Sequence, residues 1–125
     1  MAVLTREAAS TRGDELALAD DDDTRTWAQL DIRVNRLVHA LRDAGLGPGD
    51  TISVVAGNRN EWFEVALACS HAGVVFVPVS WHLVAPEMAY IIEDSGSRAV
   101  LVGHRFTDVA AEALADPRSS AVELA

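Results

Sequence analysis

Three consecutive apolar runs, TISVVA (51–56), NEWFEVALACSHAG (60–73) and VVFVPV (74–79), decide the fold that we expect for this chain. The first and third are short and almost continuously apolar, which is typical of strands covered on both faces in a parallel sheet. The middle run is long enough for the helix that must connect two parallel strands. The stretch therefore predicts an α/β fold: a layered, mostly parallel sheet with crossover helices.

The crossover helix carries its own start and stop signals. Asn60 is the expected N-cap, Glu61 suits the positive end of the helix, and Gly73 suits the left-handed position that closes it. The residues between them leave little polar surface. We therefore expect this helix to be buried on most sides, as in a domain that is layered between larger parts.

The chain after residue 79 continues the alternation of helix and strand. Pro86 suits the first turn of a helix, Ser95–Gly96 suits its end, and Asp116–Pro117 stops a later helix. The expected elements are a loop at 80–83, a helix from 86, a strand at 98–102, a helix at 106–115 and a strand-like run, SAVELA, at 120–125.

The chain before residue 51 predicts a short helix at 3–10 and a strand at 15–20. The acidic run at 20–23 predicts a turn whose carboxylates face water, because consecutive carboxylates do not converge on a cation. Thr26 and Gln29 form a capping-box pair, which places the start of a second helix. Its apolar stripe is Leu30, Val34, Leu37, Val38 and Leu41, and Gly45 suits its C-terminal closure.

Composition limits the class of protein. A chain of 125 residues that is 50% hydrophobic predicts one domain and no second one. Its net charge of -9 argues against nucleic-acid and anionic-membrane partners. The single cysteine, Cys69, has no disulfide partner, and no apolar segment reaches the length of a membrane span. We expect a cytoplasmic protein.

Two loops lie where ligands bind in open α/β sheets, beyond the carboxyl ends of the strands. The first, 57–60, offers Arg59 and free backbone N–H groups to an anion, but an ordinary capped turn explains it better. The second, 80–83, offers Trp81 and His82 to an apolar pocket or to proton transfer. No acidic partner orients the histidine in sequence, so packing or an interface explains it better.

Several segments together resemble the N-terminal part of the AMP-forming acyl-CoA synthetases, an adenylate-forming family that includes the fatty-acid CoA ligases. The resemblance covers 24–101 and follows the order and spacing of that family's opening pattern. Its segments are TWAQL (26–30), GLGPGD (45–50), NRNEWF (58–63), AGVVFVP (72–78) and PEMAYIIEDS (86–95). The variant WHLVAPE (81–87) looks closest to bacterial fatty-acyl or related carboxylic-acid ligases.

The resemblance implies a two-step ligase in the complete enzyme. ATP and a carboxylic acid give an acyl-adenylate and pyrophosphate with Mg²⁺, and coenzyme A then displaces AMP. That reaction requires a Ser/Thr/Gly-rich loop with a lysine for the triphosphate, an acidic residue for Mg²⁺, an aspartate for the ribose and a further lysine. This sequence contains none of these motifs and no lysine. We expect no catalytic, cofactor-binding or metal-binding residues here, and no activity of this chain alone.

We expect the chain to be an N-terminal structural segment of a synthetase, and two other functions stay open. The first is a stand-alone interaction module that pairs with a full-length synthetase or completes a split one. A weaker alternative is a small flavodoxin-like nucleotide binder. That alternative needs a phosphate-cradling loop, and the turn at 57–60 is poorly equipped for this role.

Overall fold

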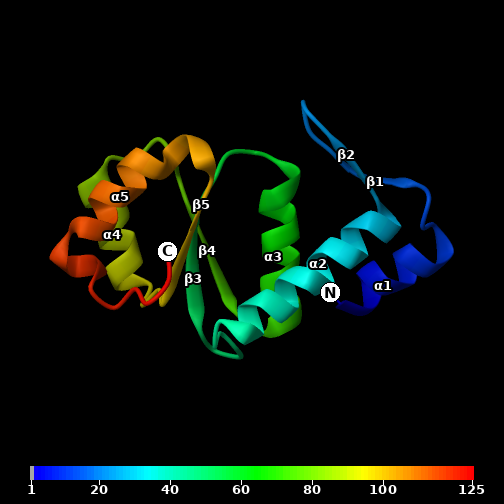
Figure 1. Ribbon diagram of the computed structural model, residues 1–125, viewed down its shortest axis with the longest axis horizontal. Helices are drawn as coiled ribbons and strands as arrows, with labels where there is room; N and C mark the ends of the chain where they lie inside the picture. The colour runs from blue at the N-terminus through cyan, green and yellow to red at the C-terminus, as the bar shows by residue number, and fades with distance from the viewer. Residues whose placement is uncertain (1) are drawn as a thin grey trace. The chain divides into compact units, whose positions relative to one another are not determined.

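The computed structural model describes residues 2–125 and has the expected mixed α/β architecture (Figure 1). The described chain divides into two compact units. Unit 1 comprises the residues up to Pro48 together with Asn58–Val74. Unit 2 comprises Gly49–Gly57 together with Val75–Ala125.

Unit 1 consists of three helices and a hairpin. The helices are α1 (Ala2–Thr11), α2 (Trp27–Asp43) and α3 (Asn60–Ala72), and the antiparallel hairpin pairs β1 (Leu16–Ala19) with β2 (Thr24–Thr26). The helix at 3–10 and the strand at 15–20 are confirmed. The short strand β2 was not predicted, because its three residues carry no apolar alternation of their own and pair only through β1.

Helix α2 confirms its sequence signals. The side chain of Thr26 accepts a hydrogen bond from the backbone N–H of Gln29 at 3.3 Å, and the side chain of Gln29 accepts one from the N–H of Thr26 at 2.9 Å. Four of the five stripe residues are buried and Leu37 is half-buried. The helix closes with Gly45 at a φ of 81°, in the left-handed region.

Helix α3 contacts α1 and α2. Its C-cap is Gly73, at a φ of 75°, as expected. The prediction that α3 is buried on most sides is wrong for this chain, because Phe63 keeps 48% of its surface exposed and Leu67 is only half-buried. The neighbouring helices cover only part of a helix that is apolar on almost every side.

Unit 2 is built on three parallel strands in the order β4-β3-β5 (Figure 1). They are β3 (Thr51–Val55), β4 (Val75–Val79) and β5 (Ala99–Val102). The helices of this unit are α4 (Ala85–Asp94) and α5 (Thr107–Ala115), with 3-10 turns at His104–Phe106 and Pro117–Ser119. The terminal run SAVELA adds a single parallel bridge, between Leu124 and Ala99.

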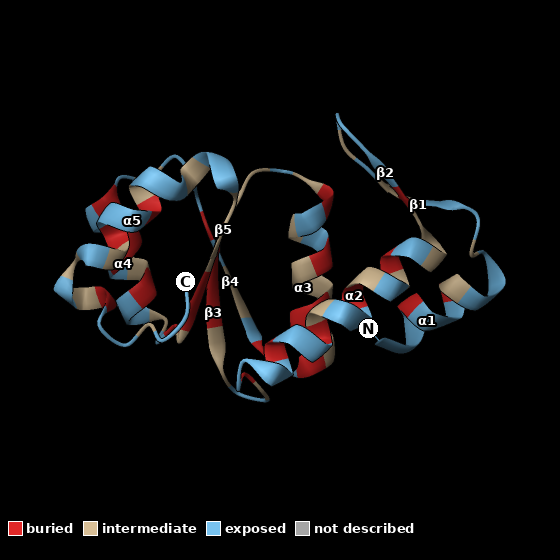
Figure 2. Ribbon diagram, viewed as in Figure 1, coloured by how far each residue is buried: buried red, intermediate tan, exposed pale blue. Residues whose placement is uncertain are grey.

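The core of unit 2 lies between one face of the sheet and the helices α4 and α5. Val55, Val79 and Val100 come from the three strands and pack with Met88 and Ile92 of α4. All five residues are buried. Figure 2 shows buried segments (red) on the strands of unit 2 and on α4 and α5. Alternate residues of a strand share one face, so the valines at these register positions form one continuous apolar surface.

Pro78 lies in the edge strand β4, where the lack of a backbone N–H donor destabilises the sheet least. The N–H of Val75 donates to the carbonyl of Asp50 at 2.7 Å, so this residue and its alternate neighbours bond toward β3. Pro78 falls on the opposite alternation, and its ring nitrogen faces away from the ladder. A proline there blunts an edge strand without breaking the sheet.

The glycine at position 73 provides a test of local strain. A Cβ at Gly73 would lie 3.2 Å from the backbone Cα of Pro48, whereas a Cβ at Gly45 or Gly47 would meet nothing within 4 Å. We predict that Gly45→Ala costs about 1–2 kcal/mol through its positive φ alone. Gly73→Ala should cost more than that, and Gly47→Ala should be nearly neutral. Urea unfolding measures the stability of all three variants. Equal stabilities for Gly73→Ala and Gly47→Ala would contradict the steric conflict with Pro48 that we expect at position 73.

The contact between α1 and α3 predicts a dependence of stability on pH. The hydroxyl of Thr5 lies 3.2 Å from Nε2 of His71, and burial lowers the pKa of that imidazole below 6.5. Because the folded state disfavours the protonated ring, His71 makes stability fall as the pH drops below 6.5. Urea midpoints at pH 7.5 and 5.5 should differ less in His71→Gln than in the natural chain. An unchanged difference would rule out this origin.

Candidate functional site

The carboxyl ends of the parallel strands in unit 2 are covered by aromatic rings. The ring centroid of Trp81 lies 3.5 Å from that of His82, with 28° between the planes, and 5.4 Å from that of Phe106, with 24°. Trp81 keeps 43% of its surface exposed. His82 is thus part of a ring stack, which supports the packing interpretation of this loop over proton transfer.

Phe106 closes the strand ends against two glycines. A Cβ at Gly103 would lie 3.4 Å from the Phe106 ring and 3.6 Å from Ala56, and a Cβ at Gly57 would lie 3.8 Å from the same ring. A Cβ at either position would make only ordinary van der Waals contact with the ring, so the apolar ring of Phe106 packs closely over the edge where α/β proteins hold ligands.

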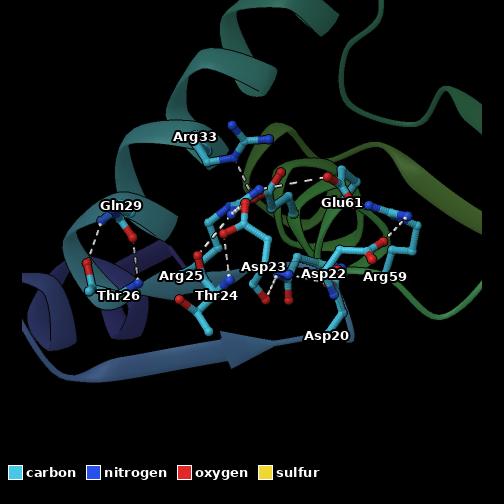
Figure 3. Close-up of polar contacts among 12 residues, drawn as sticks. Asp20, Asp22, Asp23, Thr24, Arg25, Thr26, Gln29, Arg33, Arg59 and Glu61 are labelled. Carbon is cyan, nitrogen blue, oxygen red and sulfur yellow. Dashed lines mark hydrogen bonds and ion pairs between the residues drawn. The ribbon is translucent and has the colours of Figure 1, made fainter.

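The polar groups of unit 1 gather at the N-terminus of α3, in an arrangement that we call the hairpin–helix cluster (Figure 3). Its members are Asp20, Asp22, Asp23, Arg25, Arg33, Arg59, Asn60, Glu61 and Glu64. They come from the hairpin tip and β2, from α2, from the N-cap residue Arg59 and from the first two turns of α3.

The hairpin tip caps α3 from a distance in sequence. Oδ2 of Asp20 accepts the backbone N–H of Asn60 at 2.9 Å, and Oδ1 accepts the N–H groups of Asp22 and Asp23. The N-cap residue itself is Arg59, without a side-chain cap, so the prediction of Asn60 as N-cap is wrong. Asn60 instead donates its side-chain amide to the carbonyl of Asp23 at 3.0 Å. The turn is confirmed, but its carboxylates do more than face water.

Arg59 is committed to carboxylates. Its guanidinium donates to Asp22 at 2.9 Å and to Glu61 at 3.3 Å. The cluster as a whole contains five carboxylates against three guanidinium groups, which repels an anion at this helix end. The anion-binding interpretation of 57–60 therefore loses its cation, and the structural interpretation is favoured.

The buried centre of the cluster is an ion network around Glu64. Glu64 is 1% exposed and Arg25 is 8% exposed. Oε1 of Glu64 accepts a hydrogen bond from Nε of Arg25 at 3.0 Å and another from Nε of Arg33 at 2.5 Å. Arg25 also pairs with Asp23 and lowers the pKa of that carboxyl, while the N–H of Asn60 lowers the pKa of Asp20.

The network was missed by sequence reasoning, although one signal was present. Glu64 is an acid inside the most apolar helix of the chain, and such a position requires a buried counter-charge. The arginines that supply it are 39 and 31 residues away, and no local pattern joins them.

The titratable groups of unit 1 are held in buried or hydrogen-bonded positions. Burial raises the pKa of the Cys69 thiol to about 11, so it stays protonated and unreactive at neutral pH. Among the residues that the structure describes, no group of three His, Cys, Asp or Glu side chains is arranged to hold a metal ion. The clustered carboxylates are held by backbone N–H groups and arginines, which leaves them poor general bases.

Comparison with known proteins points to one family. The family model described as AMP-binding enzyme matches residues 5–124. The fatty acid–[acyl-carrier-protein] ligase ScoC of Streptomyces coeruleorubidus is 38% identical over 101 residues, which are 81% of this chain and 20% of that protein. A medium/long-chain-fatty-acid–CoA/3-oxocholest-4-en-26-oate–CoA ligase of Mycobacterium marinum is 32% identical over 116 residues, 93% of this chain and 21% of that protein.

Solved structures agree with the sequence relatives. A Mycobacterium tuberculosis fatty acyl CoA synthetase matches with a TM-score of 0.88 and 29% identity, over 98% of this chain and 25% of that one. These matches confirm the fold class and the resemblance seen in the sequence. The chain spans about a fifth of the length of the two curated relatives named above.

The buried ion network predicts a large difference between two neighbouring acids. Glu64→Gln removes the buried negative charge that Arg25 and Arg33 share and should cost about 3–5 kcal/mol of unfolding free energy. Glu61→Gln removes a carboxylate whose side chain is 49% exposed and lies 3.8 Å from Arg25, and should cost less than about 1 kcal/mol. Urea unfolding compares them, and equal costs would show that the network does not hold the unit together.

Proposed function

Because this chain belongs to the AMP-binding enzyme family, we propose that it is the N-terminal structural segment of an ATP-dependent acyl-CoA synthetase. The match of the family model to residues 5–124 carries this proposal. The complete enzyme would convert a carboxylic acid, ATP and coenzyme A into acyl-CoA, AMP and pyrophosphate. The names of the relatives, which are ligases of fatty acids and of a steroid acid, support this class of substrate.

The role proposed for these residues is architectural. The segment provides a parallel sheet with its helices and a clamped hairpin, and the reactive groups come from the rest of the enzyme. The lysine and arginine positions of this chain are all arginine, and six of these arginines already pair with carboxylates among the described residues. Arg98, for example, donates to Asp50 at 2.8 Å and to Glu123 at 2.6 Å. Such pairs do not supply the charge that a triphosphate needs.

We propose that the described residues hold neither Mg²⁺ nor a nucleotide, and the contacts of two places support this proposal. At the hairpin tip, Asp20 binds the N-terminus of α3, and Asp22 and Asp23 bind arginines. The N-terminus of α3 is filled by the carboxylate of Asp20, and the strand ends of unit 2 are filled by Phe106. These observations also weigh against a flavodoxin-like nucleotide binder. We propose that this chain alone has no activity.

The alternative of a separate interaction module has one observation in its favour. Leu4 and Phe63 are large apolar residues that stay 63% and 48% exposed in unit 1. A module that pairs with a full-length synthetase, or completes a split one, would cover them. As a covalent segment or as a separate module, the chain would contact the same partner, the remainder of an AMP-binding enzyme.

The location and domain content follow from the same proposal. None of the described helices combines the length and the apolar character that a membrane crossing needs. We propose that the chain is one part of a single AMP-binding domain and that it works in the cytoplasm.

A chimeric enzyme tests the proposed function. This chain should replace the aligned segment of the Mycobacterium tuberculosis fatty acyl CoA synthetase and keep its fatty-acid-dependent ATP–pyrophosphate exchange within about tenfold, a loss of about 1.4 kcal/mol. The same enzyme with that segment deleted serves as the inactive control. A chimera that folds, as judged by circular dichroism and gel filtration, yet shows no exchange would contradict the proposal.

A further inference from the structure

Unit 1 contains an apolar hollow of about 470 Å³ that the function described so far does not use. Its walls come from α1, β1, α2 and α3. We call it the α1–α3 groove, and its main lining residues are Leu4, Ala8, Leu18, Trp27, Phe63 and Leu67. Ala8 is buried, whereas Leu4 and Phe63 keep 63% and 48% of their surface exposed.

The groove has no charge that would hold the head group of a small ligand. The basic residue in its lining, Arg12, lies over the Trp27 ring at 5.2 Å from the centroid and faces Glu15 at 4.0 Å. Glu7 adds a carboxylate to the same lining. A fatty acid or another amphipathic anion would therefore meet as much repulsion as attraction there.

A second copy of this chain is also a poor occupant. Each copy carries a net charge of -9, and two such copies repel one another on association. An uncharged apolar surface suits the groove better. In the relatives, about four fifths of the length lies outside the part that matches this chain, so the remainder of such an enzyme is the occupant that we consider.

We propose that the α1–α3 groove is the surface on which the remainder of the AMP-binding enzyme packs, through an apolar segment that covers Phe63 and Leu4. This inference rests on the proposed function and names the contact through which the segment would join its enzyme. It also explains why α3 is apolar on sides that this chain leaves open: the missing cover belongs to the rest of the enzyme.

Cysteine labelling tests the groove directly, because the natural Cys69 is buried and its thiol is protonated. Phe63→Cys and, as a control, Ile32→Cys place a thiol on α3 and α2 respectively. Ile32 is 52% exposed, similar to Phe63, but lies among charged residues such as Arg33 and Arg36. Each variant is made in the 125-residue chain and in the chimera with the Mycobacterium tuberculosis synthetase. Maleimide incorporation at each position is followed by peptide mass spectrometry.

We expect both thiols to react readily in the 125-residue chain. In the chimera, the thiol at position 63 should react at least about tenfold more slowly, since access controls thiol labelling, while the thiol at position 32 keeps its rate. Equal rates at position 63 in both proteins, or equal slowing at both positions, would overturn the groove proposal. The pyrophosphate exchange of the unsubstituted chimera reports separately on the proposed function, so an active chimera with a reactive Cys at position 63 refutes only the groove.

Discussion

The buried carboxylate of Glu64 is the constraint on which unit 1 depends. A charge that is almost completely removed from water requires counter-charges with good hydrogen-bond geometry. Arg25 from β2 and Arg33 from α2 supply them, so one side chain of α3 binds two consecutive elements that lie 39 and 31 residues earlier in the sequence. The hairpin tip is thereby held where Asp20 can cap α3. Capping, hairpin position and helix packing are therefore coupled through one acid.

The local signals in the sequence predicted the elements well. The capping box at Thr26, the closing glycines at 45 and 73 and the apolar runs around 51–79 each act within a few residues, and the structure confirms them. What sequence could not predict is non-local. Asp20 caps a helix forty residues later, and nothing near Asn60 indicates that its own side chain serves a different bond. The expected burial of α3 was wrong for a similar reason. An apolar sequence pattern shows which side chains need to be buried, but it does not show which part of the protein buries them.

The two candidate loops share a structural explanation. At 57–60 the cation is neutralised by Asp22 and Glu61, and at 80–83 the histidine lies in a ring stack. Parallel sheets usually present their functional edge at these places, and here both are occupied by the chain's own side chains. This pattern supports the proposed role of a structural segment, in which the reactive groups come from the rest of the enzyme.

The central claim is that these 125 residues provide architecture and no reactive groups. Its most direct test is isotope exchange between pyrophosphate and ATP, measured with the purified chain, Mg²⁺ and a panel of fatty acids. The account predicts a rate no higher than that of the protein-free background at every concentration of the chain. Exchange that depends on the acid and rises in proportion to the protein would contradict it.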